Sequence, residues 1–199
     1  VHLDGWTWED MTIAGPLALY VYWPGAAAFS PWAETEAAKK ADETQKEKIA
    51  ALKQAFADAR AYATARKAGD VKGAPRLHRE PKWDSMIAAI DGTIPVVIRA
   101  RYASEIEDAL KWAETEGLRV ILAGAEEAYA VTDLLKSKNI PVILDPMFDF
   151  PPRRDQPYDR LFSLPRELNE AGIRIAFSMD KKAPDARNLA YSAAMAVAY

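Results

Sequence analysis

The downstream half of the chain repeats one local pattern, in which a short apolar segment is followed by an amphipathic stretch of helix length. The apolar segments predict strands over Ile94–Ala100, Arg119–Ala123, Ile140–Asp145 and Arg174–Ser178. Strands this short and this apolar are typical of a sheet that is covered on both faces. The stretches between them are long enough for the helical crossovers that parallel neighbours require. We therefore expect an α/β fold in which the four strands lie side by side and parallel, in chain order.

The connecting segments carry helix signals. Ser104 and Glu107 form an S-x-x-E capping box, and Gly117 is expected to end the helix that they begin. The inner face of this helix is predicted at Ile106, Ala109, Leu110 and Ala113. Further helices are predicted from about Glu126 to Lys136, over Pro165–Ala171, and onward from about Asn188.

The upstream part of the chain has a different character. Within a single domain, residues 1–30 are predicted to form strands or a β-hairpin, residues 31–82 a long helix and a loop, and residues 83–199 the β/α units. Ser30 is the expected N-cap of the long helix, with Pro31 at its first position. A partner-binding coiled coil is the less favoured alternative for this helix, since no heptad persists. A shorter helix is predicted over Trp83–Ile90, directly before the first parallel strand.

Composition excludes several classes of function. The chain has 199 residues, of which 28% are charged, with a net charge of −3, and its arginines are not interleaved with aromatic residues, so we expect no nucleic-acid partner. No apolar run reaches the roughly 20 residues of a membrane span. The absence of cysteine excludes disulfides, thiolate metal sites and a cysteine nucleophile. Because the sequence starts with Val1 and stops at Tyr199 within a helical pattern, we expect it to be a fragment of a longer protein.

Candidate functional residues lie at the carboxyl ends of the predicted strands, where α/β sheets and barrels place their sites. Arg99 and Arg101 follow the first strand, Gly124 ends the second, Asp145 ends the third, and Asp180 follows the fourth. Taken alone, each polar residue is better explained as a helix cap or a solvated loop charge. Their occurrence at equivalent positions favours a shared site.

Other signals of a site are weaker. The proline- and charge-rich loop Phe150–Arg160 leaves the same end of the third strand and is expected to be either a surface loop or a substrate lid. The two histidines, His2 and His78, do not follow predicted parallel strands, so this chain offers no imidazole-rich metal site. Motifs of dinucleotide-binding, nucleoside-triphosphate-binding, serine-hydrolase and zincin sites are absent from the sequence.

From about Trp83 to Tyr199, the sequence resembles the amidohydrolase superfamily, and within it the branch that contains imidazolonepropionase and Xaa-Pro dipeptidases. The stretch IPVVIRARYASEIEDALKWAETEGLRVILAGAEEAYAVTDLLKSKNIPVIL is similar to the fifth and sixth strand–helix units and the seventh strand of the (β/α)₈ barrel. The segments AGIRIAFSMD and RNLAYSAAMAVAY are similar to its eighth strand and the following helix. The resemblance implies a partial TIM-like barrel, about the second half, whose earlier strands precede Val1.

The resemblance also implies altered metal chemistry. In active relatives the fifth and sixth strands each end in a metal-ligand histidine, and these positions correspond here to Arg99 and Gly124. Asp180 corresponds to the aspartate that ends the eighth strand and acts as a metal ligand or general base. The family typically uses zinc or another divalent cation, but one carboxylate cannot hold such an ion. We therefore expect no metal cofactor in this chain, with Asp180 as the catalytic candidate.

This departure suggests why arginines end the first strand. A carboxylate at the barrel mouth that lost its metal would be costly to bury unless another cation replaced it. Strand alternation puts Arg99 on the same face as Val97, so Arg99 is expected to pair with Asp180 or, as a second choice, with Asp145. Arg101 would add a second cation on that side and so form, with Arg99 and Asp145, a mouth that binds anions.

Two functions follow as expectations. The first is hydrolysis of C–N bonds in cyclic amides or peptides, if the full-length protein is active. The second is a degenerate, non-catalytic barrel that binds an anionic ligand or serves as a structural partner subunit. The expected partners are a small-molecule or peptide ligand and either another copy of the chain or a homologous subunit, with no membrane involved.

Overall fold

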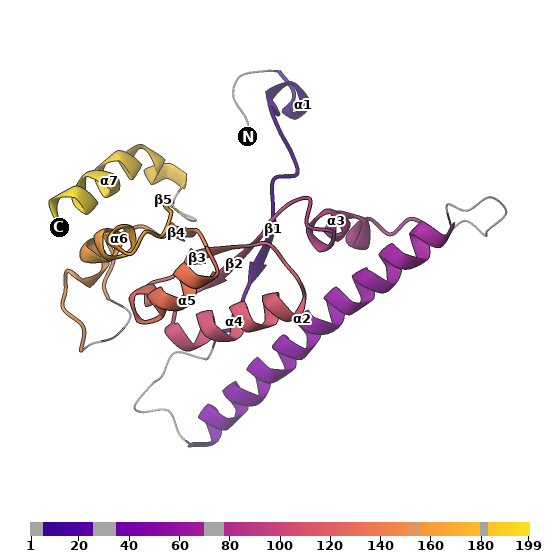
Figure 1. Cartoon of the computed structure of the whole chain (residues 1–199), viewed down its shortest axis with the longest axis horizontal. Coiled ribbons are helices and arrows are strands. Elements are labelled where there is room, and N and C mark those ends of the chain that lie inside the picture. The colour runs from indigo at the N-terminus through magenta and orange to yellow at the C-terminus, as the bar shows by residue number, and fades with distance from the viewer. Residues whose placement is uncertain (1–5, 26–34, 70–77, 152, 154, 180–182) are drawn as a thin grey trace.

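A five-stranded parallel sheet organises the chain in the computed structural model, which describes residues 6–25, 35–69, 78–151, 153, 155–179 and 183–199. The strands are β1 (Leu19–Tyr22), β2 (Val96–Ala100), β3 (Val120–Gly124), β4 (Val142–Leu144) and β5 (Ile175–Phe177), and they lie in chain order (Figure 1). Every neighbouring pair is parallel. The prediction of four adjacent parallel strands downstream of Ile94 is therefore confirmed.

Of the strands or β-hairpin predicted for residues 1–30, the described residues contain a strand but no hairpin, so the hairpin is wrong. A short helix, α1 (Trp8–Met11), precedes the single strand β1, and β1 pairs in parallel with β2. The Leu19 amide donates to the Pro95 carbonyl at 3.0 Å, and the ladder continues to the Trp23 amide, which donates to the Arg99 carbonyl at 3.0 Å. This segment therefore pairs with a strand that is distant in the sequence and not with a neighbouring one. Residues 1–5 and 26–34 lie outside the described structure.

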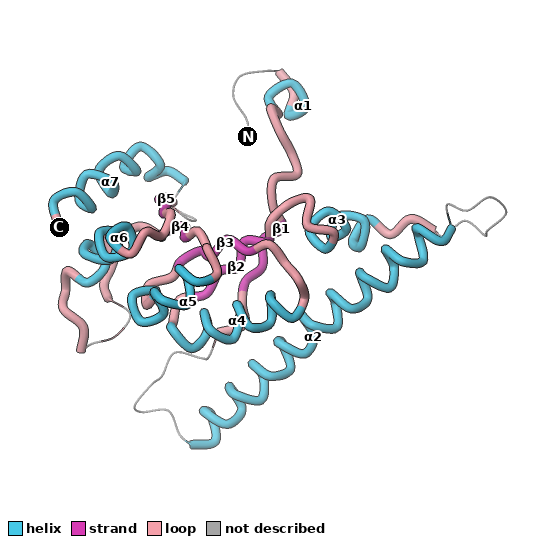
Figure 2. Tube along the Cα trace, in the orientation of Figure 1, coloured by secondary structure: helices cyan, strands magenta, loops and turns pink. Residues whose placement is uncertain are grey.

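The helices are α2 (Thr35–Gly69), α3 (Pro81–Ile90), α4 (Ala103–Thr115), α5 (Thr132–Ser137), α6 (Arg160–Glu170) and α7 (Leu189–Ala198), with 3₁₀ turns over Ala128–Val131 and Ala183–Asn188 (Figure 2). The predicted long helix is present and unbroken from Thr35, and the predicted Trp83–Ile90 helix is α3. The helix α2 continues to Gly69, and α3 begins at Pro81, two residues before the predicted start at Trp83.

Helix boundaries differ from expectation in three places. The helix α4 begins at Ala103, and the carboxylate that reaches back is Glu105, which accepts the Arg101 amide at 3.0 Å; Ser104 and Glu107 are exposed. The expected helix from Glu126 to Lys136 is replaced by the 3₁₀ turn and the shorter α5. The helix α6 begins at Arg160, before the predicted start, because Leu161 and Leu164 bury an additional turn.

The core lies on one side of the sheet. Strand residues of one alternation meet residues of α2, α4, α5 and α6 in a single apolar cluster, to which the strands contribute Val21, Val96, Ile98, Ala100, Val120, Leu122, Val142 and Leu144. The Trp112 ring of α4 contacts Phe56 of α2 at a centroid distance of 4.9 Å and Trp23 at 5.5 Å. This aromatic contact packs the long helix α2 against α4. In Figure 1, α2 passes α4 diagonally.

The other alternation of strand residues forms a second face, which we call the open face and define by Tyr20, Tyr22, Val97, Ile121, Ile143 and Ala176. None of these six residues belongs to the apolar cluster. Tyr20 and Tyr22 are 45% and 57% exposed and Ala176 is exposed, whereas Val97 is buried. Arg99 and Asp145 lie at the carboxyl-terminal end of this face by the same alternation. Among the described residues, no helix is long and apolar enough to cross a membrane.

Candidate functional site

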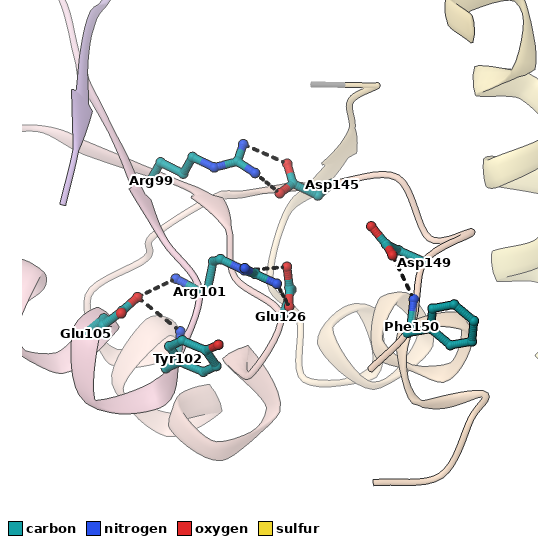
Figure 3. Close-up of polar contacts among 8 residues, drawn as sticks. All are labelled: Arg99, Arg101, Tyr102, Glu105, Glu126, Asp145, Asp149 and Phe150. Carbon is teal, nitrogen blue, oxygen red and sulfur yellow. Dashed lines mark hydrogen bonds and ion pairs between the residues drawn. The ribbon is translucent and has the colours of Figure 1, made fainter. Parts of the chain in front are cut away.

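A pocket of about 190 Å³ lies at the carboxyl ends of the middle strands. Three of the predicted site residues, Arg99, Arg101 and Asp145, line it together with Gly124. The side chains of Glu126 and Asp149 join them (Figure 3). Asp180 lies outside the described residues, so its role stays a prediction.

Arg99 and Asp145 form a two-pronged ion pair. The Arg99 Nη1 donates to Asp145 Oδ1 at 3.1 Å, and Nη2 donates to Oδ2 at 2.5 Å. The two side chains are only 17% and 14% exposed. They meet because Arg99 pairs in register with Ala123 and Ala123 with Ile143, which places Asp145 two residues further along the same face. Arg99 is therefore within 4 Å of its second-choice partner, Asp145, whereas the favoured pairing with Asp180 falls outside the described residues and stays a prediction.

Tyr20 extends this polar group onto β1. It is adjacent in register to Val97, two residues before Arg99 on the same face. Burial raises the pKa of the Tyr20 phenol, while a hydrogen bond with the Arg99 guanidinium opposes that increase. A phenol that stays protonated is a hydrogen-bond donor and acceptor beside the ion pair. The sequence did not single out Tyr20, because the strand that carries it was expected to belong to a hairpin.

Arg101 makes a second two-pronged ion pair, with Glu126. Its Nε and Nη2 donate to the two carboxylate oxygens at 2.7 and 2.9 Å. The hydrogen bond with Glu126 raises the pKa of Arg101. The Arg101 side chain is 48% exposed, so it remains accessible from solvent, whereas Glu126 is only 13% exposed. Both guanidinium groups of the pocket are thus matched by carboxylates, and the third carboxylate, Asp149, accepts the amide of Phe150 at 2.9 Å.

The backbone conformation at position 124 favours glycine. Its φ is +84°, and a Cβ at this position would lie 3.3 Å from the Ala100 carbonyl oxygen and 3.5 Å from Asp145 Oδ2. A histidine at position 124 would therefore begin from a strained backbone against the ion pair. The glycine at this place allows β3 to end close to Arg99 and Asp145.

Replacing Gly124 by alanine is expected to lower the free energy of unfolding by about 1–2 kcal/mol, because the left-handed conformation is costly for a residue with a Cβ. Urea denaturation measures the change. Gly92→Ala is the comparison variant: Gly92 also has a positive φ but open space around it, so its loss measures the cost of the conformation alone, and any larger loss at Gly124 measures the contacts with the Ala100 carbonyl and Asp145. A Gly124→Ala variant as stable as the unmodified protein would contradict the conformation described for β3.

Glu127 connects the site to the loop that follows β4. It is 2% exposed, and its carboxylate accepts the Ala103 amide at 3.1 Å and both Nε and Nη2 of Arg153. One carboxylate therefore joins the start of α4 to the loop Phe150–Arg160. Pro146, Met147 and Asp149, just before that loop, line the pocket. Whether the loop acts as a lid stays a prediction, and residues 152 and 154 lie outside the description.

The Glu127→Gln variant is expected to lose about 1–2 kcal/mol of unfolding free energy, because hydrogen bonds to a charged acceptor are replaced by weaker ones. Faster proteolysis within residues 150–160 is the second expected change, since Arg153 loses its anchor. Glu114→Gln is the control, as the Glu114 side chain is 65% exposed in its pair with Lys138 and should change stability by less than about 0.5 kcal/mol. Equal proteolysis of both variants would argue against the anchoring role of Glu127.

The described residues do not fit a metal ion. Arg99 stands where the resemblance implies a ligand, and a guanidinium has no lone pair to offer. Gly124 has no side chain for the second position. Across the described ranges, no three histidine, cysteine, aspartate or glutamate residues are grouped so that they could hold a cation. His78 lies before α3, where it bonds to the Arg79 carbonyl, and His2 is outside the description.

Comparison with solved structures identifies the architecture. The chain is similar to the crystal structure of an amidohydrolase from Thermotoga maritima MSB8, with a TM-score of 0.75 and 20% sequence identity. This chain has an amidohydrolase-like fold. The similarity covers 96% of this chain and 49% of the other, so this chain spans about half the length of the structure that it matches. The predicted partial barrel is thereby confirmed. No protein-family model matches the chain, and no curated protein matches it either.

Proposed function

We propose that this chain supplies a ligand-binding half of an amidohydrolase-like barrel, in which ion pairs replace metal ligands and the pocket binds a small ligand through a carboxylate. The observation that carries the proposal is the ion pair of Arg99 and Asp145. It stands at the strand end where the resembled family places a metal ligand. An internal guanidinium there supplies the positive charge that a metal ion would otherwise provide.

The accessible cation of the pocket is Arg101. A ligand carboxylate can bind the other edge of its guanidinium, through Nη1 and the second N–H group of Nη2, because Glu126 accepts only from Nε and Nη2. Arg99 is held more tightly, since its pair with Asp145 is less exposed. Arg99 thus shapes the pocket, and Arg101 binds the ligand.

Succinate is a suitable probe, with neutral succinamide as its matched control. We expect calorimetric binding of succinate to the complete protein and no binding of succinamide. Arg101→Met should weaken succinate binding at least about tenfold, equivalent to about 1.4 kcal/mol, while Arg166→Met, at a 56% exposed side chain of α6, should leave it unchanged. Succinate binding that is absent, or that does not depend on Arg101, would overturn the proposal.

A second candidate function is hydrolysis of C–N bonds in cyclic amides or peptides by the complete protein. The amidohydrolase-like fold favours it, with Asp180 as the acid–base candidate of the imidazolonepropionase-like branch. The test is turnover of hydantoin and of the dipeptide Ala-Pro by the complete protein with added zinc. Turnover that is lost in Asp180→Ala would select hydrolysis, and absence of turnover would leave the binding function as the account of this site.

A further inference from the structure

The lining of the pocket divides into a buried apolar part and an exposed charged part. The buried part, which we call the apolar floor, consists of Leu144, Met147, Leu161 and Leu164, each at most 7% exposed. Leu144 ends β4, and Leu161 and Leu164 lie about one turn apart on the same side of α6. Asp149, by contrast, is exposed. A ligand in this pocket therefore has apolar contacts on its buried side and charged neighbours on its exposed side.

Two members of the apolar floor lie outside the main core. Met147 and Leu161 are 2% and 7% exposed, but neither belongs to the apolar cluster between the sheet and the helices. Both line the pocket instead. Buried apolar side chains beside a pocket offer an apolar group of a ligand a place that is already shielded from water.

The charges of the lining are not balanced. It contains two guanidinium groups, of Arg99 and Arg101, and three carboxylates, of Glu126, Asp145 and Asp149, so it carries one net negative charge. Arg99 pairs with Asp145, and Arg101 pairs with Glu126. Within the lining, the excess negative charge is therefore that of Asp149.

This distribution disfavours a second charge on the ligand. Arg101 offers the free edge of its guanidinium to one carboxylate. The far end of a dicarboxylate would meet either the apolar floor, where it loses its hydration, or Asp149, which repels it. A cationic far end would gain little from Asp149, because water and salt screen an exposed charge. An apolar far end gains by leaving water for the apolar floor.

We infer that the ligand of this pocket carries a single carboxylate, bound by Arg101, and a short apolar group that packs on the apolar floor. The inference rests on the proposed function for the place of the carboxylate and adds which carboxylates the pocket selects. The pocket volume of about 190 Å³ is below the roughly 300–1,000 Å³ of sites for drug-sized ligands, so the apolar group is short. Short aliphatic monocarboxylates are the ligand class that fits.

Three probes that share one carboxylate and differ at the far end test the inference in calorimetric titrations of the complete protein. Isocaproate has an isopropyl group where succinate has its second carboxylate, and γ-aminobutyrate has an ammonium group at its far end. We expect isocaproate to bind at least about tenfold more tightly than either of the other two. Succinate or γ-aminobutyrate that binds as tightly as isocaproate, in a manner that depends on Arg101, would overturn the inference and leave the proposed function in place. Absence of binding by all three would overturn the proposed function itself.

The Asp149→Asn variant tests the repulsion of a second carboxylate. Asp149 Oδ1 accepts the Phe150 amide at 2.9 Å, and asparagine keeps an oxygen for this bond, so the substitution removes the charge alone. We expect the variant to bind succinate about threefold more tightly and isocaproate with unchanged affinity. Asp108→Asn, at an exposed position of α4, is the control and should change neither affinity. Equal succinate affinities of Asp149→Asn and the unmodified protein would overturn the selection against a second carboxylate.

Discussion

The Asp145→Ala variant is expected to lose about 3 kcal/mol of unfolding free energy, because it leaves the Arg99 guanidinium in a mostly buried site without its carboxylate. The side chains of both residues are less than one-fifth exposed, so solvent cannot replace the lost partner fully. Equilibrium denaturation in urea measures the loss. Asp42→Ala is the matched control, since Asp42 and Lys46 pair on the surface with 57% and 73% exposed side chains and should contribute less than about 0.5 kcal/mol.

The double variant Arg99→Met with Asp145→Leu tests whether the loss of stability comes from the broken ion pair or from the removed side-chain volume. Replacing a buried pair by apolar side chains of similar volume is often neutral. We therefore expect the double variant to lie within about 1 kcal/mol of the unmodified protein, and the cycle of single and double variants to give a large coupling energy. Additive losses in this cycle would show that Arg99 and Asp145 do not depend on each other.

Replacing Phe56 by alanine is expected to lower the free energy of unfolding by about 3–5 kcal/mol, the range for deleting a large buried aromatic side chain. Phe56 is 1% exposed, and its ring meets that of Trp112 edge to face. This contact fastens the long helix α2 to α4. Thermal and urea denaturation, followed by tryptophan fluorescence, measure the change.

Phe56→Leu is the control for this prediction, because leucine keeps most of the apolar volume and should cost less than the alanine substitution. A loss below about 1 kcal/mol in Phe56→Ala would show that α2 is not packed against α4.

The predictable part of the fold is the part with strong local signals. The four downstream strands follow from short β-branched runs at helix-length spacing, and the alternation of Val97 and Arg99 correctly placed the arginine on the open face. The pairing of β1 with β2 was not predictable in this way. It joins segments that are distant in sequence, and a strand carries no local mark of its partner.

The candidate site was predicted in part. Arg99, Arg101 and Asp145 lie at one pocket because parallel strands bring their carboxyl ends to the same edge. Glu126 and Glu127 were missed, since a continuous helix was expected from Glu126. Instead the backbone takes a positive φ at both Gly124 and Ala125, the latter +54°, before a 3₁₀ turn. Alanine gives no sequence signal for that conformation.

Anomalous X-ray diffraction at the zinc edge, on crystals of the complete protein grown with zinc, shows whether an ion pair or a metal ion occupies the site. We expect electron density for the two-pronged pair of Arg99 and Asp145 and no zinc peak bonded to either Asp145 or Asp180. A zinc peak about 2.0–2.2 Å from a carboxylate oxygen of either aspartate, with the Arg99 side chain turned away from Asp145, would contradict this expectation.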